Sequence, residues 1–198
     1  MTWTGWKQVT MYSAAQVEWA AMQIGVAREM GIDSETVRKA LAGFEGVKRR
    51  FTRTGEAGGI TVIDDYAHHP TEIEATISAT KNGWPDRRVI VIFQPHRYSR
   101  TKCLADTFKT CFDKADMVII TSIFAASEDP IPGVTGELVV NSIIETGFKK
   151  VHYIERKDEI PIFLTSKLKK DDIVITMGAG DIHRVTKEIS TRLKNQKL

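Results

Sequence analysis

The sequence has 198 residues, 42% of them hydrophobic, which is enough for one domain with a sizeable core and a smaller appendage. Its formal net charge of +3 is spread along the chain, whereas nucleic-acid-binding domains usually gather basic residues on one face, so we expect no nucleic-acid partner. No apolar stretch is long enough to span a bilayer, so we expect no membrane partner. Residues 1–10 lack the apolar centre of a secretory signal, and Cys103 and Cys111 are poorly placed for a disulfide. We therefore expect a cytoplasmic protein.

Two helices are predicted near the start of the chain. The composition of Ala14–Met30 is helical. A second helix is capped by Asp33 or Ser34, whose side chains can accept hydrogen bonds from free backbone N–H groups, and it runs through Ala42. Residues 1–12 show no clear period and are left unassigned. Because two helices alone cannot form a domain of this type, we interpret residues 1–46 as the helical remnant of a preceding domain with its linker.

Strand-like and helix-like segments alternate through residues 47–198, which we interpret as the main domain. Such alternation predicts an α/β fold of Rossmann-like type, with a mostly parallel sheet and helices on both faces. The predicted strands are Ile60–Asp65, Val89–Phe93, Met117–Thr121, Val151–Ile154 and Ile173–Met177, with a further edge strand at Phe51–Glu56. The predicted helices are Thr71–Asn82, Thr101–Lys114, Glu137–Thr146, Asp158–Leu168 and Asp181–Lys194.

Polar loops follow three of the predicted strands, at Asp64–His69, Gln94–Thr101 and Gly178–Ile182. The carboxyl ends of parallel strands meet at one edge of an open α/β sheet, and that edge is where ligands bind. We therefore expect these loops to converge on one site.

Arg97 and Arg100 lie three residues apart in a loop that opens a helix. Guanidinium groups bind carboxylates and phosphates with two parallel hydrogen bonds, so this pair fits a small anionic substrate. The plainer interpretation is a solvated basic turn. We favour the functional role because Pro95 stiffens the loop and His96 and Tyr98 interleave with the arginines.

His68 stands on an otherwise acidic turn and has two interpretations. It could cap the helix that follows it, or it could act in a site, with Asp64 or Asp65 holding its tautomer. The residue alone does not decide between these roles.

Two further loops are ambiguous. The Gly178-Ala-Gly180 segment hints at a dinucleotide-binding fingerprint, but the pattern is incomplete, and a tight turn with Asp181 as a helix cap is the better interpretation. Glu128 lies in a long loop with two prolines. It could bind a substrate ammonium group or be a solvated surface acid, and we favour the latter.

Several catalytic patterns are absent from the printed sequence. It contains no G-x-x-x-x-G-K-[ST] phosphate cradle, no Cys/His set with the spacing of metal ligands, and no G-x-S-x-G nucleophile motif. We therefore expect no metal site and only part of a complete active site on this chain.

Five segments, taken in order, resemble the C-terminal part of the Mur ligases, the ATP-dependent amino-acid-adding enzymes of peptidoglycan synthesis. They are Gly46–Phe51, Asp64–Glu72, Phe93–Thr101, Ile131–Gly133 and Gly178–Ile182. The Phe93–Arg97 stretch is similar to the branch that joins L-alanine to UDP-N-acetylmuramate. The resemblance implies that residues 1–46 come from a central ATPase domain, and that ATP and Mg²⁺, bound mainly by that domain, serve as cosubstrate and cofactor in the full-length enzyme.

The resemblance also implies roles for individual residues. Arg50, Asp65 and His68 match positions that lie near the nucleotide in this family. The residues Tyr66, His96, Arg97 and Arg100 match the amino-acid pocket. It implies no catalytic group on this segment alone, so we expect the isolated chain to be inactive.

Three other functions remain open at this point. The chain could be a non-catalytic binding module, or part of the related recycling ligase, which attaches a whole peptide to the same sugar nucleotide. It could also be a dinucleotide-dependent oxidoreductase, although Gly178-Ala-Gly180 lies too near the end of the printed sequence for the usual fingerprint.

Overall fold

The structure, a computed structural model, describes residues 14–42 and 48–195. The chain divides into two compact units, residues 1–47 and residues 48–198. Among the described residues, no helix combines the length and the apolar character that crossing a membrane requires. The unassigned residues 1–12 lie outside the described part of the chain.

The first unit contains helices α1 (Ala14–Glu29) and α2 (Ser34–Ala42), as predicted. Gly31, with φ of 73°, lies just after the end of α1, and a side-chain cap begins α2. Asp33 provides this cap, since its Oδ1 accepts hydrogen bonds from the backbone N of Glu35 and of Thr36, both at 3.0 Å.

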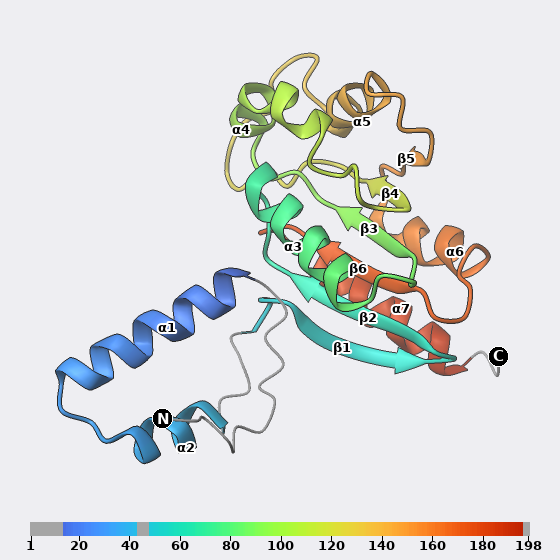
Figure 1. Cartoon of the computed structure of the whole chain (residues 1–198). Helices are drawn as coiled ribbons and strands as arrows, with labels where there is room; N and C mark the ends of the chain where they lie inside the picture. The colour runs from blue at the N-terminus through green and yellow to red at the C-terminus, as the bar shows by residue number, and fades with distance from the viewer. Residues whose placement is uncertain (1–13, 43–47, 196–198) are drawn as a thin grey trace. The chain divides into compact units, whose positions relative to one another are not determined.

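The second unit is built on a six-stranded sheet with strand order β1-β2-β6-β3-β4-β5 (Figure 1). Strand β1 pairs antiparallel with β2, and the other neighbours are parallel. This confirms the predicted mostly parallel α/β fold. The strands are β1 (Thr52–Ala57), β2 (Ile60–Asp65), β3 (Val89–Phe93), β4 (Met117–Ile120), β5 (Val151–Tyr153) and β6 (Ile173–Met177).

Helices cover both faces of this sheet, with α3 in front of it and α7 behind it in the view of Figure 1. Parallel crossovers are right-handed, so the connections from β2 to β5 keep their helices on one face and the return to β6 uses the other. The helices are α3 (Pro70–Gly83), α4 (Tyr98–Cys103), α5 (Gly136–Ile144), α6 (Ile160–Thr165) and α7 (His183–Asn195), with 3-10 helices η1 (Ala105–Lys109) and η2 (Lys157–Glu159).

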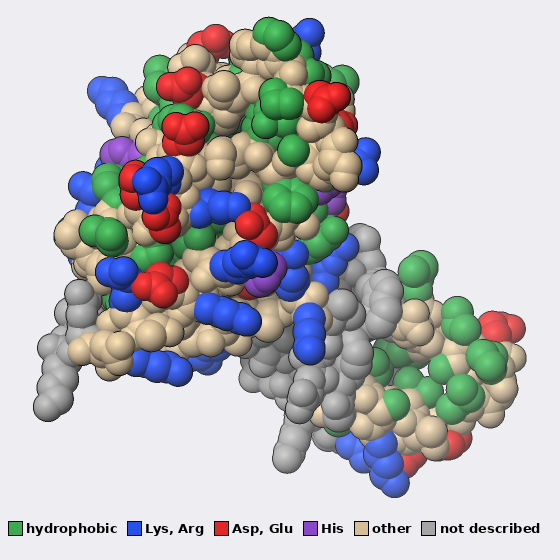
Figure 2. Space-filling view, turned by 180° about the vertical axis from the view of Figure 1, so that it is seen from behind, with side chains coloured by type: hydrophobic (Ala, Val, Ile, Leu, Met, Phe, Trp, Pro, Cys, Tyr) green, Lys and Arg blue, Asp and Glu red, His purple; other side chains and the backbone are tan. Residues whose placement is uncertain are grey.

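Every residue of β2, β3 and β6 is buried, which fits the unbroken apolar run of β3 and the mostly apolar run of β6, while β2 also encloses Thr61, Asp64 and Asp65. On the α6 and α7 side, Leu164 and Ile189 pack in one cluster with Val62, Ile90 and Val174 of the sheet. Seen from behind, basic and acidic side chains are interspersed over the second unit (Figure 2).

Two predicted helices differ from the structure. The predicted helix Thr101–Lys114 instead begins at Tyr98, ends at Cys103 and is followed by η1. The break lies at Leu104, whose φ of −100° and ψ of 9° end α4. The predicted helix Asp158–Leu168 is η2 followed by the short α6.

The position of β6 between β2 and β3 aligns their carboxyl ends. Asp65 pairs with Met177, and Met177 pairs with Phe93 on its other side. Phe93 in turn pairs with Ile120 at the end of β4. Four loops therefore leave the sheet at the same level.

Candidate functional site

The aligned strand ends bring the predicted polar loops together at one edge of the sheet, as expected from the sequence. The loop after β4, which contains Phe124 and Glu128, joins them. His96 and Phe124 form an isolated parallel β-bridge, so the loops after β3 and β4 are hydrogen-bonded to each other.

The two carboxylates at the end of β2 both accept hydrogen bonds from other groups of the protein. Asp64 accepts a hydrogen bond from Arg49 Nε at 3.1 Å and another from Thr176 Oγ1 at 2.8 Å. Asp65 accepts from the backbone N of Phe51 at 2.8 Å and of Ala67 at 2.7 Å. Burial raises the pKa of Asp65, although these backbone hydrogen bonds oppose the shift.

Arg49 is a residue that the sequence argument missed. Its Nη2 donates to the carbonyl of Gly178 at 2.6 Å, and its guanidinium lies 5.1 Å from the ring centroid of Tyr66. Arg49 therefore connects the loops after β2 and β6. Arg50 lies 5.3 Å from the same ring and forms an ion pair of 4.0 Å with Glu72. The signal for Arg49 in the sequence was its position beside Arg50, in the Gly46–Phe51 segment.

Four aromatic rings form a continuous series across this edge. The Tyr66 and His68 centroids are 5.5 Å apart, and those of His68 and His96 are 5.7 Å apart. His96 stacks on Phe124 at 5.6 Å with an interplanar angle of 15°. The series joins the loops after β2, β3 and β4 and so includes three of the residues predicted for the site.

The local partners of His68 differ from both sequence-based interpretations. Its Nδ1 lies 3.0 Å from the carbonyl of Tyr66 and 3.4 Å from Glu72 Oε2, so these groups orient the ring and not Asp64 or Asp65. The helix cap is His69, whose Nδ1 accepts from the backbone N of Thr71. Glu72 completes a capping box by accepting from the backbone N of His68 and His69.

The predicted arginines lie beside the ring series. Arg97 is exposed, and among the described residues its guanidinium has no hydrogen bond or ion pair. Arg100 Nη1 lies 3.5 Å from His96 Nδ1. Burial lowers the pKa of His96, and the positive charges of His68, Arg100 and Arg97 lower it further. The neutral imidazole and the two guanidinium groups can together accept a small carboxylate.

The glycines of the last loop serve close packing. A Cβ on Gly180 would lie 2.5 Å from Phe124 Cγ and 2.6 Å from Gln94 Oε1, so the position where a pyrophosphate would approach is filled by protein. Asp181 does not cap α7 with its side chain as expected, because its carboxylate binds Gln94 Nε2 and Lys157 Nζ. This packing argues against the dinucleotide-dependent oxidoreductase.

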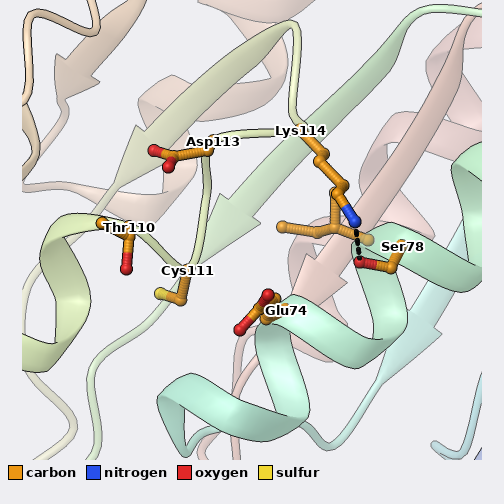
Figure 3. Close-up of a pocket in the computed structure, with 7 residues that line it drawn as sticks. Glu74, Ser78, Thr110, Cys111, Asp113 and Lys114 are labelled. Atoms are coloured by element: carbon orange, nitrogen blue, oxygen red, sulfur yellow. Dashed lines mark hydrogen bonds between the residues drawn. The ribbon is translucent and has the colours of Figure 1, made fainter.

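A cavity of about 140 Å³ lies away from these loops, between α3 and the turn that follows η1 (Figure 3). Glu74 and Ser78 line it from the helix, and Cys111 and Lys114 line it from the turn. Lys114 donates a hydrogen bond to Ser78 across the cavity at 3.1 Å. None of the predicted site residues lines it.

Comparisons with known proteins identify the family of this chain. The family described as Mur ligase, glutamate ligase domain, matches residues 49–180. The UDP-N-acetylmuramate–L-alanine ligase of Trichlorobacter lovleyi is 48% identical over 168 residues, which are 85% of this chain and 37% of that protein. The protein of the same name from Myxococcus xanthus is 44% identical over 191 residues, which are 96% of this chain and 40% of that protein. The chain thus spans about two fifths of the length of these relatives.

Solved structures give the same result. A UDP-N-acetylmuramate–alanine ligase from Thermotoga maritima matches with a TM-score of 0.78 and 27% identity, over 93% of this chain and 39% of that one. A murein peptide ligase from Psychrobacter arcticus matches with a TM-score of 0.70 and 25% identity, over 96% of this chain and 39% of that one. These likenesses confirm the resemblance that the sequence motifs indicated.

Proposed function

Because this chain belongs to the Mur ligase family, we propose that it is the C-terminal, amino-acid-binding portion of a UDP-N-acetylmuramate–L-alanine ligase. The observation that carries the proposal is the cluster of His96, Arg97 and Arg100 beside Tyr66 and His68. It offers two guanidinium groups and a neutral imidazole at the edge where loops of such sheets bind ligands. Residues 1–46, in this proposal, belong to the central ATPase domain.

The proposed reaction joins L-alanine to the muramoyl carboxylate of UDP-N-acetylmuramate, at the expense of ATP. ATP phosphorylates that carboxylate and leaves as ADP. The alanine amine then attacks the acyl carbon, loses a proton and displaces inorganic phosphate. This chain would contribute by binding and orienting the amino acid and by excluding water when the domains close.

Tyr66, His96, Arg97 and Arg100 form the proposed amino-acid pocket. Arg97 is the best candidate to bind the alanine carboxylate, because its guanidinium is exposed and uncommitted among the described residues. Burial lowers the pKa of His96, and the positive charge of Arg100, which lies next to that ring, would help to keep it neutral.

Arg50, His68 and Asp65 are proposed to lie on the nucleotide side. Arg50 is more than half exposed on the face of the Tyr66 ring and can pair with a phosphate. Asp65 is 6% exposed and accepts two backbone hydrogen bonds, so we propose that it acts mainly by holding the loop that carries Arg50.

Mg²⁺, when bound, would neutralise phosphate charge during the transfer. The described residues contain no group of three or more His, Cys, Asp or Glu side chains that could hold a metal ion. We propose that the ion is held mainly by the central domain, together with the substrate phosphates.

A chimera tests the proposal. Residues 48–198 would replace the matching segment of the Trichlorobacter lovleyi ligase, and phosphate release would be measured with UDP-N-acetylmuramate, ATP, Mg²⁺ and L-alanine. We expect alanine-dependent turnover from the chimera and none from the isolated 198-residue chain. A folded but inactive chimera would favour the non-catalytic binding module instead.

The recycling ligase is a second candidate, because a murein peptide ligase shares this fold with a TM-score of 0.70. The same chimera would be supplied with a free tripeptide of the kind found in murein in place of L-alanine. Preference for the tripeptide would favour the recycling reaction over alanine addition.

A further inference from the structure

Glu128 binds the first turn of α4, the helix that follows Arg97 and contains Arg100. Its Oε2 accepts a hydrogen bond from the backbone N of Ser99 at 3.0 Å, and its Oε1 accepts one from Ser99 Oγ at 2.6 Å. Hydrogen bonds from the Ser99 hydroxyl and backbone lower the pKa of Glu128, so the carboxylate is ionised at neutral pH. This arrangement explains Glu128 better than a substrate ammonium ligand or a solvated surface acid.

Helix α4 has no cap of its own. Arg97 occupies the N-cap position, and its side chain makes no cap hydrogen bond. The first N–H groups of a helix need an acceptor, and an anion there is favoured by the helix dipole. Glu128, which lies 29 residues after Ser99 in the sequence, provides both the acceptor and the negative charge.

The backbone around Arg97 also needs support. Arg97 has φ of 68° and ψ of 139°, a conformation that residues other than glycine rarely adopt. Two backbone hydrogen bonds of 2.8 Å hold it, from Phe124 N to the Pro95 carbonyl and from Arg97 N to the Phe124 carbonyl. Ala126 and Ser127, which lead directly to Glu128, have φ of 50° and 69°. Residues with unfavourable backbone conformations on both loops therefore lie beside the contact between Ser99 and Glu128.

We propose that Glu128 is a positioning residue, which fixes Arg97 and Arg100 for the amino-acid carboxylate by holding Ser99. This inference rests on the proposed function of the arginines, but its structural part concerns this chain alone. Glu128 does not touch the substrate in this proposal. Its loss should therefore affect amino-acid binding more than ATP use.

The first test measures amide hydrogen exchange on the 198-residue chain by NMR. We expect Glu128→Ala to speed exchange at Ser99 by about tenfold, the low end for hydrogen bonds to a charged group, and Glu128→Gln to have a smaller effect. Asp129→Asn is the matched control, since it removes a neighbouring exposed charge whose side chain makes no hydrogen bond or ion pair among the described residues. Unchanged exchange at Ser99 in Glu128→Ala would overturn the inference.

The second test places the same variants in the chimera with the Trichlorobacter lovleyi ligase. We expect Glu128→Ala to raise the KM for L-alanine by about tenfold, with the KM for ATP within about twofold of the parent. Glu128→Gln should recover part of the loss, because it keeps one acceptor oxygen. An equal rise in both KM values would indicate a general structural role and overturn the inference.

The two failures can be told apart. A parent chimera that folds but lacks activity contradicts the proposed function, and the inference is then decided by the exchange measurement alone. A parent chimera that is active, with Glu128→Ala indistinguishable from Asp129→Asn in the KM for L-alanine, contradicts only the inference.

Discussion

The imidazoles of His68 and His96 lie edge to face with centroids 5.7 Å apart, although they belong to loops that follow different strands. Two imidazoles at this distance repel when both are protonated. Burial lowers the pKa of His96 from its usual 6.5, and this repulsion lowers it further.

A first prediction concerns pH. The folded-state pKa of His96 lies below its unfolded value of 6.5, so the unfolded chain binds a proton first as pH falls. Stability is therefore full above that value and is lost as pH drops through 6.5 toward the folded pKa. We expect His96→Gln to flatten this loss in urea unfolding curves. A pH dependence equal to that of the parent below 6.5 would contradict the role of His96.

A second prediction concerns Arg97 in the chimera. Arg97→Lys keeps the positive charge but loses the planar pair of donors. We expect the KM for L-alanine to rise by about tenfold or more and the KM for ATP to change little. Arg53→Lys, on the exposed edge strand β1, is the control. Equal effects on both substrates would remove Arg97 from the amino-acid pocket.

A third prediction concerns packing at Gly180. A methyl group there would meet Phe124 at 2.5 Å and Gln94 at 2.6 Å, and both neighbours are themselves held in place. We expect Gly180→Ala to lower the free energy of unfolding by about 1–3 kcal/mol. Gly83→Ala has no atom within 4 Å of the new Cβ and should be neutral or slightly stabilising. Denaturant unfolding of both variants measures this difference in the free energy of unfolding, and equal values would contradict the prediction.

A fourth prediction concerns the Arg49–Asp64 pair. Arg49→Met would leave the Asp64 carboxylate, 3% exposed, without its cationic partner. We expect a loss of about 2 kcal/mol in the free energy of unfolding, because the pair is only partly buried. The matched variant Arg53→Met breaks an ion pair whose side chains are both more than half exposed and should lose less than about 1 kcal/mol. Similar losses in the two variants would show that Arg49 adds no special stability.

The sequence predicted the strands well because their signal is local. Buried parallel strands such as Val89–Phe93 are short runs of apolar, mostly β-branched residues, and the polar residues that follow them mark the loops. The convergence of these loops was predicted from one general property of α/β sheets.

The parts that the sequence did not predict depend on partners far along the chain. Helix α4 begins earlier than expected because Glu128, from another loop, caps it. Asp64 and Asp65 were expected at the ligand-binding edge as possible partners of His68, but Arg49, Thr176 and backbone N–H groups bind both side chains inside the protein. Residue type alone does not tell which acids will be enclosed.

The strand order has a consequence for synthesis. β6 is the last strand to leave the ribosome, yet it pairs with both β2 and β3. Until it arrives, β2 and β3 each have one edge without its partner in the finished sheet. Such edges invite wrong pairing and capture by chaperones. A chain stalled before Ile173 would therefore lack the strand that joins β2 to β3, and helix α7 with it.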